Sequence, residues 1–255
     1  MRGPDFRHRK PRLCAAIVMA AICPMAQAGV VMAGTRIAYI EQNREKTVQL
    51  TNEGDTPSFV RSWIDDGDPE ASPESVQVPF HLTPANVRVD PHRGQQLRIT
   101  YIPDVGDPLP PDRESVFYLN VLDIPPRPDM PGNVLQFAVR TRVKLFFRPA
   151  TLEGEPGNSA ALLRWSAGAT AHGPCLNVHN PSAFHVSIND ASISDDVAIL
   201  DPAMVAPGAT ACLPLNQPAS DDARLRFHWM DDYGSLVEQT AKLQAAVEGQ
   251  DEHAR

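Results

Sequence analysis

The segment NVLQFAVRTRVKLFFRP, residues 133–149, is the strongest indication of fold class in this sequence. Successive side chains of a β-strand point to opposite faces of the sheet. One face of this segment would carry Leu135, Phe137, Val139, Thr141, Val143, Leu145 and Phe147. The opposite face would carry four cationic side chains, Arg140, Arg142, Lys144 and Arg148. The pattern predicts a long strand with one apolar side and one basic side.

Shorter runs with the same alternation recur along the chain, separated by turn-rich segments. In the first part they are Gly34–Ile40, Thr47–Thr51, Phe59–Ile64, Phe80–Leu82, Val87–Val89, Leu97–Ile102 and Val116–Ile124. The chain has 25 prolines and only 15 glycines, which favours strand ends and turns over long helices. Short strands at this spacing, with almost no helical periodicity, are typical of antiparallel β-sandwiches. We therefore expect an all-β fold.

The alternation breaks after Pro149, where RPATLEGEPGNSA has the composition of a linker. Strands are expected again at Leu162–Trp165, Leu176–His179, Phe184–Ile188, Val197–Leu200, Ala211–Leu213 and in the runs RLRFHWM and SLVEQTAKL. The sequence thus predicts two β domains, residues 29–149 and 159–247. A linker at residues 150–158 joins them, and a polar tail follows at residues 248–255.

Residues 1–28 have the organisation of a secretory signal peptide. A basic start precedes the mostly apolar stretch Leu13–Ala26, which is too short to span a bilayer comfortably. Ala26-Gln27-Ala28 fits a signal-peptidase cleavage site, so we expect export rather than an uncleaved anchor. The whole chain carries a formal charge of −8, and loss of the basic start makes it more acidic. This charge argues against nucleic acid and anionic membranes as partners.

Removal of the signal peptide would leave only two cysteines in the mature chain. Cys14 and Cys23 leave with the signal peptide, so Cys175 and Cys212 are the mature pair. In an oxidising compartment two cysteines predict one disulfide. The alternative is a metal site built from His172, Cys175, His179 and His185. These residues lack the paired-ligand spacing of zinc sites, which favours the disulfide.

No catalytic motif stands out in the chain. There is no G-x-S-x-G elbow, no G-x-x-x-x-G-K-[ST] loop and no H-E-x-x-H pair. The acidic pairs Asp65-Asp66, Asp195-Asp196 and Asp231-Asp232 lie in turn contexts, which favour solvated or turn-capping roles. We therefore expect neither enzymatic activity nor a cofactor.

Several long motifs, in order, resemble one known family. They are GTRIAY at Gly34–Tyr39, PFHLTPANVRVDP at Pro79–Pro91, DRESVFYLNVLDIPP at Asp112–Pro126, the segment at residues 133–149, LNVHNPSAFHVSI at Leu176–Ile188, and DDYG. Together they resemble the periplasmic pilus-assembly chaperones of the chaperone–usher pathway, the PapD-like family. The short connection RPDMPG, Arg127–Gly132, resembles the short-loop branch of that family, associated mainly with rod-like pili.

The resemblance implies two immunoglobulin-like domains set at an angle, with a cleft between them. It implies a periplasmic chaperone that lends a strand to pilus subunits lacking one, and then delivers them to an outer-membrane usher. Such donation is β-augmentation, in which main-chain hydrogen bonds join the strands and alternating side chains fill a slot. A homodimer that covers the sticky strand of the free protein is a further expectation.

The resemblance also assigns roles to residues. Leu135, Phe137 and Val139 match the donated apolar positions. Arg36 and Lys144 match the pair that anchors the subunit's C-terminal carboxylate. Glu114, Arg148 and Asp232 match an ion network between the domains, although the adjacent Asp231 makes the last assignment ambiguous.

Other interpretations remain open on the residues alone. Periodicity by itself favours Leu135, Phe137 and Val139 as ordinary core residues, and Arg36 and Lys144 as surface charges. Glu114 and Arg148 would then be a surface ion pair worth under about 1 kcal/mol. For the whole chain, the alternatives are an exported two-domain immunoglobulin-like adhesin or fibre component, and a metal or ligand carrier that uses the histidine–cysteine segment.

Overall fold

The computed structural model describes residues 29–127, 135–193, 202–220 and 223–244. Five features discussed above lie outside these residues. They are the expected signal peptide, the connection Arg127–Gly132 except for Arg127, the acidic pair Asp195-Asp196, the expected strand Val197–Leu200 and the polar tail. In the described part of the chain, no helix is both long and apolar enough to cross a membrane.

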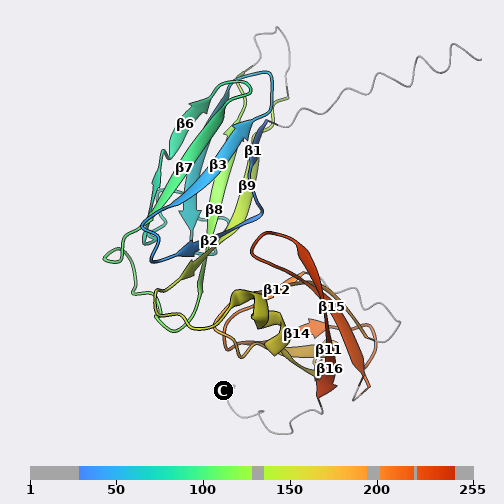
Figure 1. Ribbon diagram of the computed structural model, residues 1–255. Coiled ribbons are helices and arrows are strands. Elements are labelled where there is room, and N and C mark those ends of the chain that lie inside the picture. The colour runs from blue at the N-terminus through green and yellow to red at the C-terminus, as the bar shows by residue number, and fades with distance from the viewer. Residues whose placement is uncertain (1–28, 128–134, 194–201, 221–222, 245–255) are drawn as a thin grey trace, which may run out of the picture.

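The first half of the chain forms two facing sheets (Figure 1). One has the order β1-β3-β7-β5, with strands Val30–Met32, Lys46–Asn52, Gly94–Tyr101 and Phe80–Thr83. The other has the order β2-β9-β8-β4-β6, with strands Arg36–Ile40, Val139–Arg148, Ser115–Ile124, Ser58–Asp65 and Asn86–Val89. The pairings are antiparallel except for β2 with β9, which run parallel.

Alternation along these strands explains the core between the two sheets. Leu50 of β3, Leu97 and Ile99 of β7, and Leu119 of β8 are fully buried, and the residues between them on β3 and β7 are more exposed. Tyr39, Phe80 and Phe147 stack or meet edge to face at the end of the sandwich nearest the second half. The aromatic cluster closes this end of the core with geometries that aromatic rings prefer.

The second half of the chain has its own core, separate from the first. Its strands are β10 Arg164–Thr170, β11 Gly173–His179, β12 Val186–Ile193, β13 Ala203–Val205, β14 Thr210–Pro214, β15 Arg224–Met230 and β16 Leu236–Gln244. They form one continuous sheet of order β13-β12-β15-β16-β10-β11-β14, because β10 pairs in parallel with β16. Trp165 and Phe227 pack together inside it.

A disulfide joins Cys175 to Cys212, with an S–S distance of 1.99 Å, as expected. It connects β11 with its neighbour β14.

The two halves lie at an angle to each other (Figure 1). The sheet that contains β2, β9 and β8 ends close to the turn between β15 and β16. The fold is therefore all-β with two domains, as predicted.

Two local expectations differ from the structure. The long strand predicted over residues 133–149 begins only at Val139, where its last pairing with Asp123 of β8 lies. Beyond that pair β8 ends at Ile124, so residues 135–138 have no strand partner within the part of the chain that the structure describes. The strand expected from Leu162 starts at Arg164, because Ser159–Leu162 forms the short helix α2 after the 3₁₀ turn η2 at Pro156–Asn158.

Candidate functional site

The apolar face of β9 changes its surroundings partway along the strand. Val143, Leu145 and Phe147 are buried in the first core. On the same side, Leu135, Phe137 and Val139 are 79%, 69% and 59% exposed. One stripe of large apolar side chains therefore serves as core at one end and faces solvent at the other. We call residues 135–139 the exposed segment.

The edge of β9 is also open next to the exposed segment. On one side β8 pairs with β9 from Val139 to Phe147. On the other side β2 pairs with it only from Lys144 to Arg148. Strand β1 lies opposite the open stretch, and a hollow of about 640 Å³ separates them, which we call the edge hollow. Unpaired backbone groups along such an edge are a template for an added strand.

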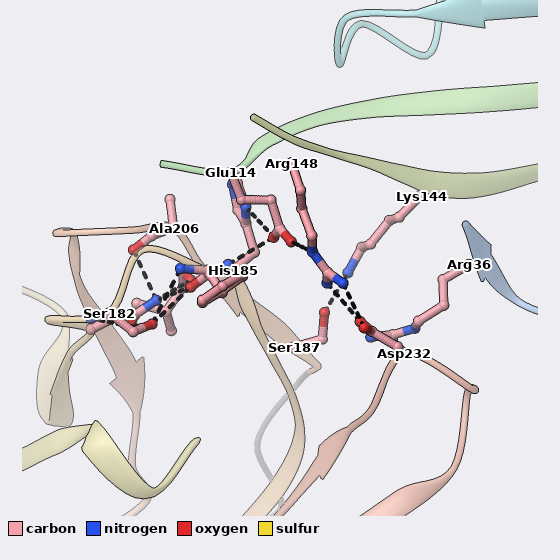
Figure 2. A network of polar contacts seen from close by, with 12 residues as sticks. Arg36, Glu114, Lys144, Arg148, Ser182, His185, Ser187, Ala206 and Asp232 are labelled. Atoms are coloured by element: carbon pink, nitrogen blue, oxygen red, sulfur yellow. Dashed lines mark hydrogen bonds and ion pairs between the residues drawn. The ribbon is translucent and has the colours of Figure 1, made fainter. Parts of the chain in front are cut away.

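Two cations lie where the open edge ends. Arg36 of β2 and Lys144 of β9 are paired in the parallel register. Arg36 Nη1 donates to the carbonyl oxygen of Met230 at 2.8 Å, and Lys144 Nζ donates to Ser187 Oγ at 3.1 Å. Both partners belong to the second domain, so the cations bridge the two halves (Figure 2). They line a hollow of about 470 Å³ between the halves, which we call the cleft.

The electrostatics of this pair favour an anion. Within the described residues, neither Arg36 nor Lys144 has a carboxylate at ion-pair distance, and the buried Arg36 Nε has no hydrogen-bond partner. Burial lowers the pKa of Lys144, and the positive charge of Arg36 lowers it further. Burial also lowers the pKa of Arg36, although Asp232, Asp231 and Glu114 oppose that shift. A carboxylate bound between the two would relieve both desolvation and repulsion.

Next to the cleft, an ion network ties the domains together (Figure 2). Arg148 Nε donates to Glu114 Oε2 at 2.7 Å, and its two terminal nitrogens reach the Asp232 carboxylate at 2.6 and 2.7 Å. Glu114 Oε1 accepts a hydrogen bond from the backbone N–H of His185 at 2.9 Å. The ring Nδ1 of His185 lies 2.9 Å from the same oxygen. The structure thus brings Glu114, Arg148 and Asp232 together and adds His185 to them.

The neighbouring acids Asp231 and Asp232 have different partners. Asp231 Oδ1 accepts the backbone N–H groups of Tyr233 at 2.9 Å and Ser235 at 2.8 Å. This acid caps the turn between β15 and β16, as its turn context predicted. Asp232, the next residue, faces Arg148 instead.

Sequence reasoning missed the importance of Asp65. We expected a solvated or turn-capping acid, and one of its contacts fits: Asp65 Oδ1 accepts the N–H of Gly67 at 2.9 Å. Its side chain is nevertheless fully buried at the end of β4, and Arg142 donates to its two oxygens at 3.0 and 2.5 Å. The signal available in the sequence was the basic face of β9, because several cations at alternate positions on one face favour an acid close to them.

The histidine–cysteine segment does not form a metal site in the described residues. Cys175 is held in the disulfide. His179 Nδ1 lies 3.1 Å from Thr210 Oγ1, whereas His185 contacts Glu114. The residues of the metal-carrier alternative therefore point to separate partners.

Comparisons with known proteins agree with this geometry. Residues 29–153 match the family described as pili and flagellar-assembly chaperone, PapD N-terminal domain, and residues 158–241 match pili assembly chaperone PapD, C-terminal domain. The chaperone protein FimB/FhaD of Bordetella pertussis is 40% identical over 235 residues, which are 89% of this chain and 93% of that protein. The probable fimbrial chaperone YadV of Escherichia coli is 37% identical, over 85% of this chain and 90% of that protein.

Solved structures show the same likeness. The crystal structure of the YadV chaperone has a TM-score of 0.72 at 34% identity and covers 85% of this chain and 100% of that one. A chain of the complex of the Salmonella enterica SafA pilin with the SafB chaperone has a TM-score of 0.68 at 25% identity, over 84% and 96% of the two chains. Because both domain families match in order and together span most of the chain, this protein belongs to the PapD family of pilus-assembly chaperones.

Proposed function

We propose that this protein is a periplasmic chaperone that binds pilus subunits by lending them its exposed segment. In this proposal Leu135, Phe137 and Val139 enter the groove of an incomplete subunit. The subunit's last strand pairs with the open edge of β9, and its C-terminal carboxylate is bound by Arg36 and Lys144. The protein then hands the subunit to an outer-membrane usher. Binding and hand-over are exchanges of noncovalent contacts and need no cofactor.

The observation that carries the proposal is the continuity between these features. An exposed apolar stripe and an open strand edge run along β9 and end at two half-buried cations, which have no carboxylate partner among the described residues. A strand that bonds to the edge therefore arrives with its terminus at the cations. Fully burying each of the three side chains stabilises a complex by roughly 1.5–3 kcal/mol before ordering costs. Charge-assisted hydrogen bonds to the carboxylate add to this and fix the position of the strand.

The test is co-expression in a bacterial periplasm with the subunit encoded beside this gene, followed by pull-down. We compare the wild type with Lys144→Ala and Arg36→Ala, and with Lys242→Ala as a matched control, because Lys242 is an exposed lysine of β16. Wild type and control should recover a one-to-one complex, and the two cleft variants should recover at least tenfold less while still folding. Equal recovery by all four would remove the anchor role. No recovery by any would favour the adhesin or fibre-component alternative.

The exposed segment also affects self-association of the protein when no subunit is bound. Three large apolar side chains beside an open edge favour pairing with a second copy when no subunit is present. We propose a weak homodimer through this segment. Sedimentation equilibrium should show concentration-dependent association for the wild type and a monomer for Phe137→Asp at the same concentrations. A monomeric wild type would contradict self-capping and leave subunit binding untouched.

A further inference from the structure

The basic face of β9 presents three cations in series. Arg140, Arg142 and Lys144 alternate along the strand, so neighbours are about 6.6 Å apart. A bound strand displaced by one residue would turn its apolar side chains to the wrong face, but a displacement by two residues keeps them on the same face. Side-chain alternation therefore cannot exclude a two-residue slip. Which cation is free to bind the terminal carboxylate decides the register.

The structure makes these cations unequal. Arg142 gives its Nε and Nη2 groups to the Asp65 carboxylate, and Nη2 also donates to the Gly67 carbonyl at 3.1 Å. Its guanidinium carbon lies 3.6 Å from the centre of the Tyr118 ring. These contacts occupy much of the planar fork that would otherwise bind a carboxylate.

Arg140 is occupied in a similar way. Its Nε donates to Asn120 Oδ1 at 2.8 Å, and its Nη1 donates to the Pro69 carbonyl at 2.7 Å. Asn120 in turn donates to Asp65 at 2.7 Å, so both arginines belong to one cluster around the same buried acid. Lys144 stands outside this cluster.

Arg142 nevertheless lies within reach of a bound terminus. It lines the cleft together with Arg36 and Lys144, and it also lines the edge hollow together with Val139 and Thr141. About a quarter of its side chain, 24%, is exposed. Without Asp65, Arg142 would be a second carboxylate site, two residues before Lys144.

We propose that Asp65 is a specificity-determining residue that withholds Arg142 from the subunit's carboxylate and so fixes the bound strand at Lys144. The proposal rests on the proposed function, because it concerns the register of that same bound strand. It assigns the basic face of β9 two tasks. Lys144 binds the partner, and Arg142 is neutralised within the protein so that it does not compete.

The test uses two synthetic peptides with free carboxylates. One is the C-terminal strand of the co-expressed subunit, and the other lacks its last two residues. Binding to the purified protein is measured by calorimetry. The wild type should prefer the full peptide by about tenfold, because the short peptide loses contacts in either placement. In the register of the full peptide its carboxylate ends beside an occupied Arg142, and after a two-residue slip to Lys144 it leaves the last two positions at its other end unpaired. In Asp65→Asn this preference should fall to about threefold or less, through tighter binding of the short peptide.

Controls separate register from stability. A purely structural role of Asp65 would weaken both peptides equally and leave the preference at its wild-type value, which would overturn the proposal. Asp65→Asn/Arg142→Gln removes both charges of the closest pair and leaves Arg140, whose Nη2 lies 3.9 Å from Asp65 in the wild type, with its bonds to Asn120 and Pro69, so it also serves if the single variant does not fold. It should bind both peptides as the wild type does. A loss of short-peptide binding in this double variant would show that Arg142 already binds carboxylates in the wild type, and would overturn the proposal.

The outcome also distinguishes this proposal from the proposed function. If the wild type binds neither peptide, or binds the amidated full peptide as tightly as the free acid, carboxylate anchoring fails and the role of Asp65 fails with it. If the wild type binds the full peptide in a carboxylate-dependent way but Asp65→Asn keeps the same preference, only the role of Asp65 is overturned.

Discussion

At the scale of single residues, the binding proposed for the cleft comes at a cost in stability. Lys144 keeps its ammonium half-buried beside Arg36, and a hydroxyl is its hydrogen-bond partner in the second domain. Burying a charge without an opposite charge is unfavourable. Such an arrangement persists when the missing charge arrives with a partner. The same logic explains why the buried Arg36 Nε has no internal hydrogen-bond partner in the described chain.

The first prediction concerns this cost. Lys144→Met should raise the free energy of unfolding at pH 7 by on the order of 1 kcal/mol, because it removes a desolvated charge, while abolishing subunit recovery. The pKa of Lys144 is lowered in the folded protein, so folding disfavours its protonated form. The unfavourable contribution is therefore full at neutral pH and disappears as the pH rises through the lowered pKa toward the ordinary value of about 10.4.

The measurement is urea unfolding of wild type and Lys144→Met from pH 7 to pH 10.5, with Lys242→Met as the control. The advantage of Lys144→Met should shrink with rising pH, and the control should stay within about 0.5 kcal/mol of the wild type throughout. A Lys144→Met protein less stable than the wild type at pH 7 would mean that the bond to Ser187 outweighs the burial of the charge.

At the scale of elements, β9 shows what the sequence could and could not predict. Alternation correctly predicted a strand from Val139 to Arg148 with an apolar and a basic side, but placed its start too early. It could not predict where the apolar side leaves the core, because Phe137 and Phe147 have the same chemistry. Their surroundings differ because β8 ends at Ile124 and β2 begins pairing only at Lys144. Burial along one strand was thus decided by neighbours distant in sequence.

Elements too short for a period were also missed. Strand β1 spans Val30–Met32 and helix α2 spans Ser159–Leu162, each shorter than the window in which alternation or helical spacing can be recognised. Asp65 was missed for a related reason. Two acids before a glycine are typical of a turn, and only the tertiary contact with Arg142 makes the first of them a buried acid.

The second prediction compares two positions on the same side of β9. Phe137→Ser should change the free energy of unfolding by less than about 0.5 kcal/mol, because the side chain is 69% exposed, while reducing subunit recovery at least tenfold. Leu145→Ala should cost about 2–5 kcal/mol, because that side chain is fully buried. Denaturant unfolding and pull-down of both variants test this. A marked loss of stability in Phe137→Ser would return the exposed segment to the core.

At the scale of the whole molecule, function depends on how the two domains are held. The cleft cations bond across to Met230 and Ser187, so the shape of the binding site depends on the angle between the domains. The network of Glu114, Arg148 and Asp232 lies beside them, with Glu114 1% and Arg148 11% exposed in their side chains. We expect the network to act as a rigid joint, because Arg148 bonds to a carboxylate of each domain at the same time.

The third prediction tests that joint. Glu114→Gln should lower the free energy of unfolding by about 1–3 kcal/mol, because Arg148 loses one of its two carboxylate partners and the backbone N–H of His185 loses a charged acceptor. Arg61→Gln is the matched control, since Arg61 pairs with Glu74 at the surface and such pairs contribute about 0–1 kcal/mol.

Calorimetry and small-angle scattering read out the two consequences of Glu114→Gln separately. Each domain keeps its own core, so loosening the joint should split the thermal transition into two and broaden the distribution of distances in solution. Subunit recovery should fall as well, although every residue proposed to touch the subunit is intact, because Arg36 and Lys144 no longer face Met230 and Ser187 at a fixed angle. A single transition and unchanged scattering, together with normal recovery, would mean that the strand contacts alone orient the domains and that the ion network is dispensable for the cleft.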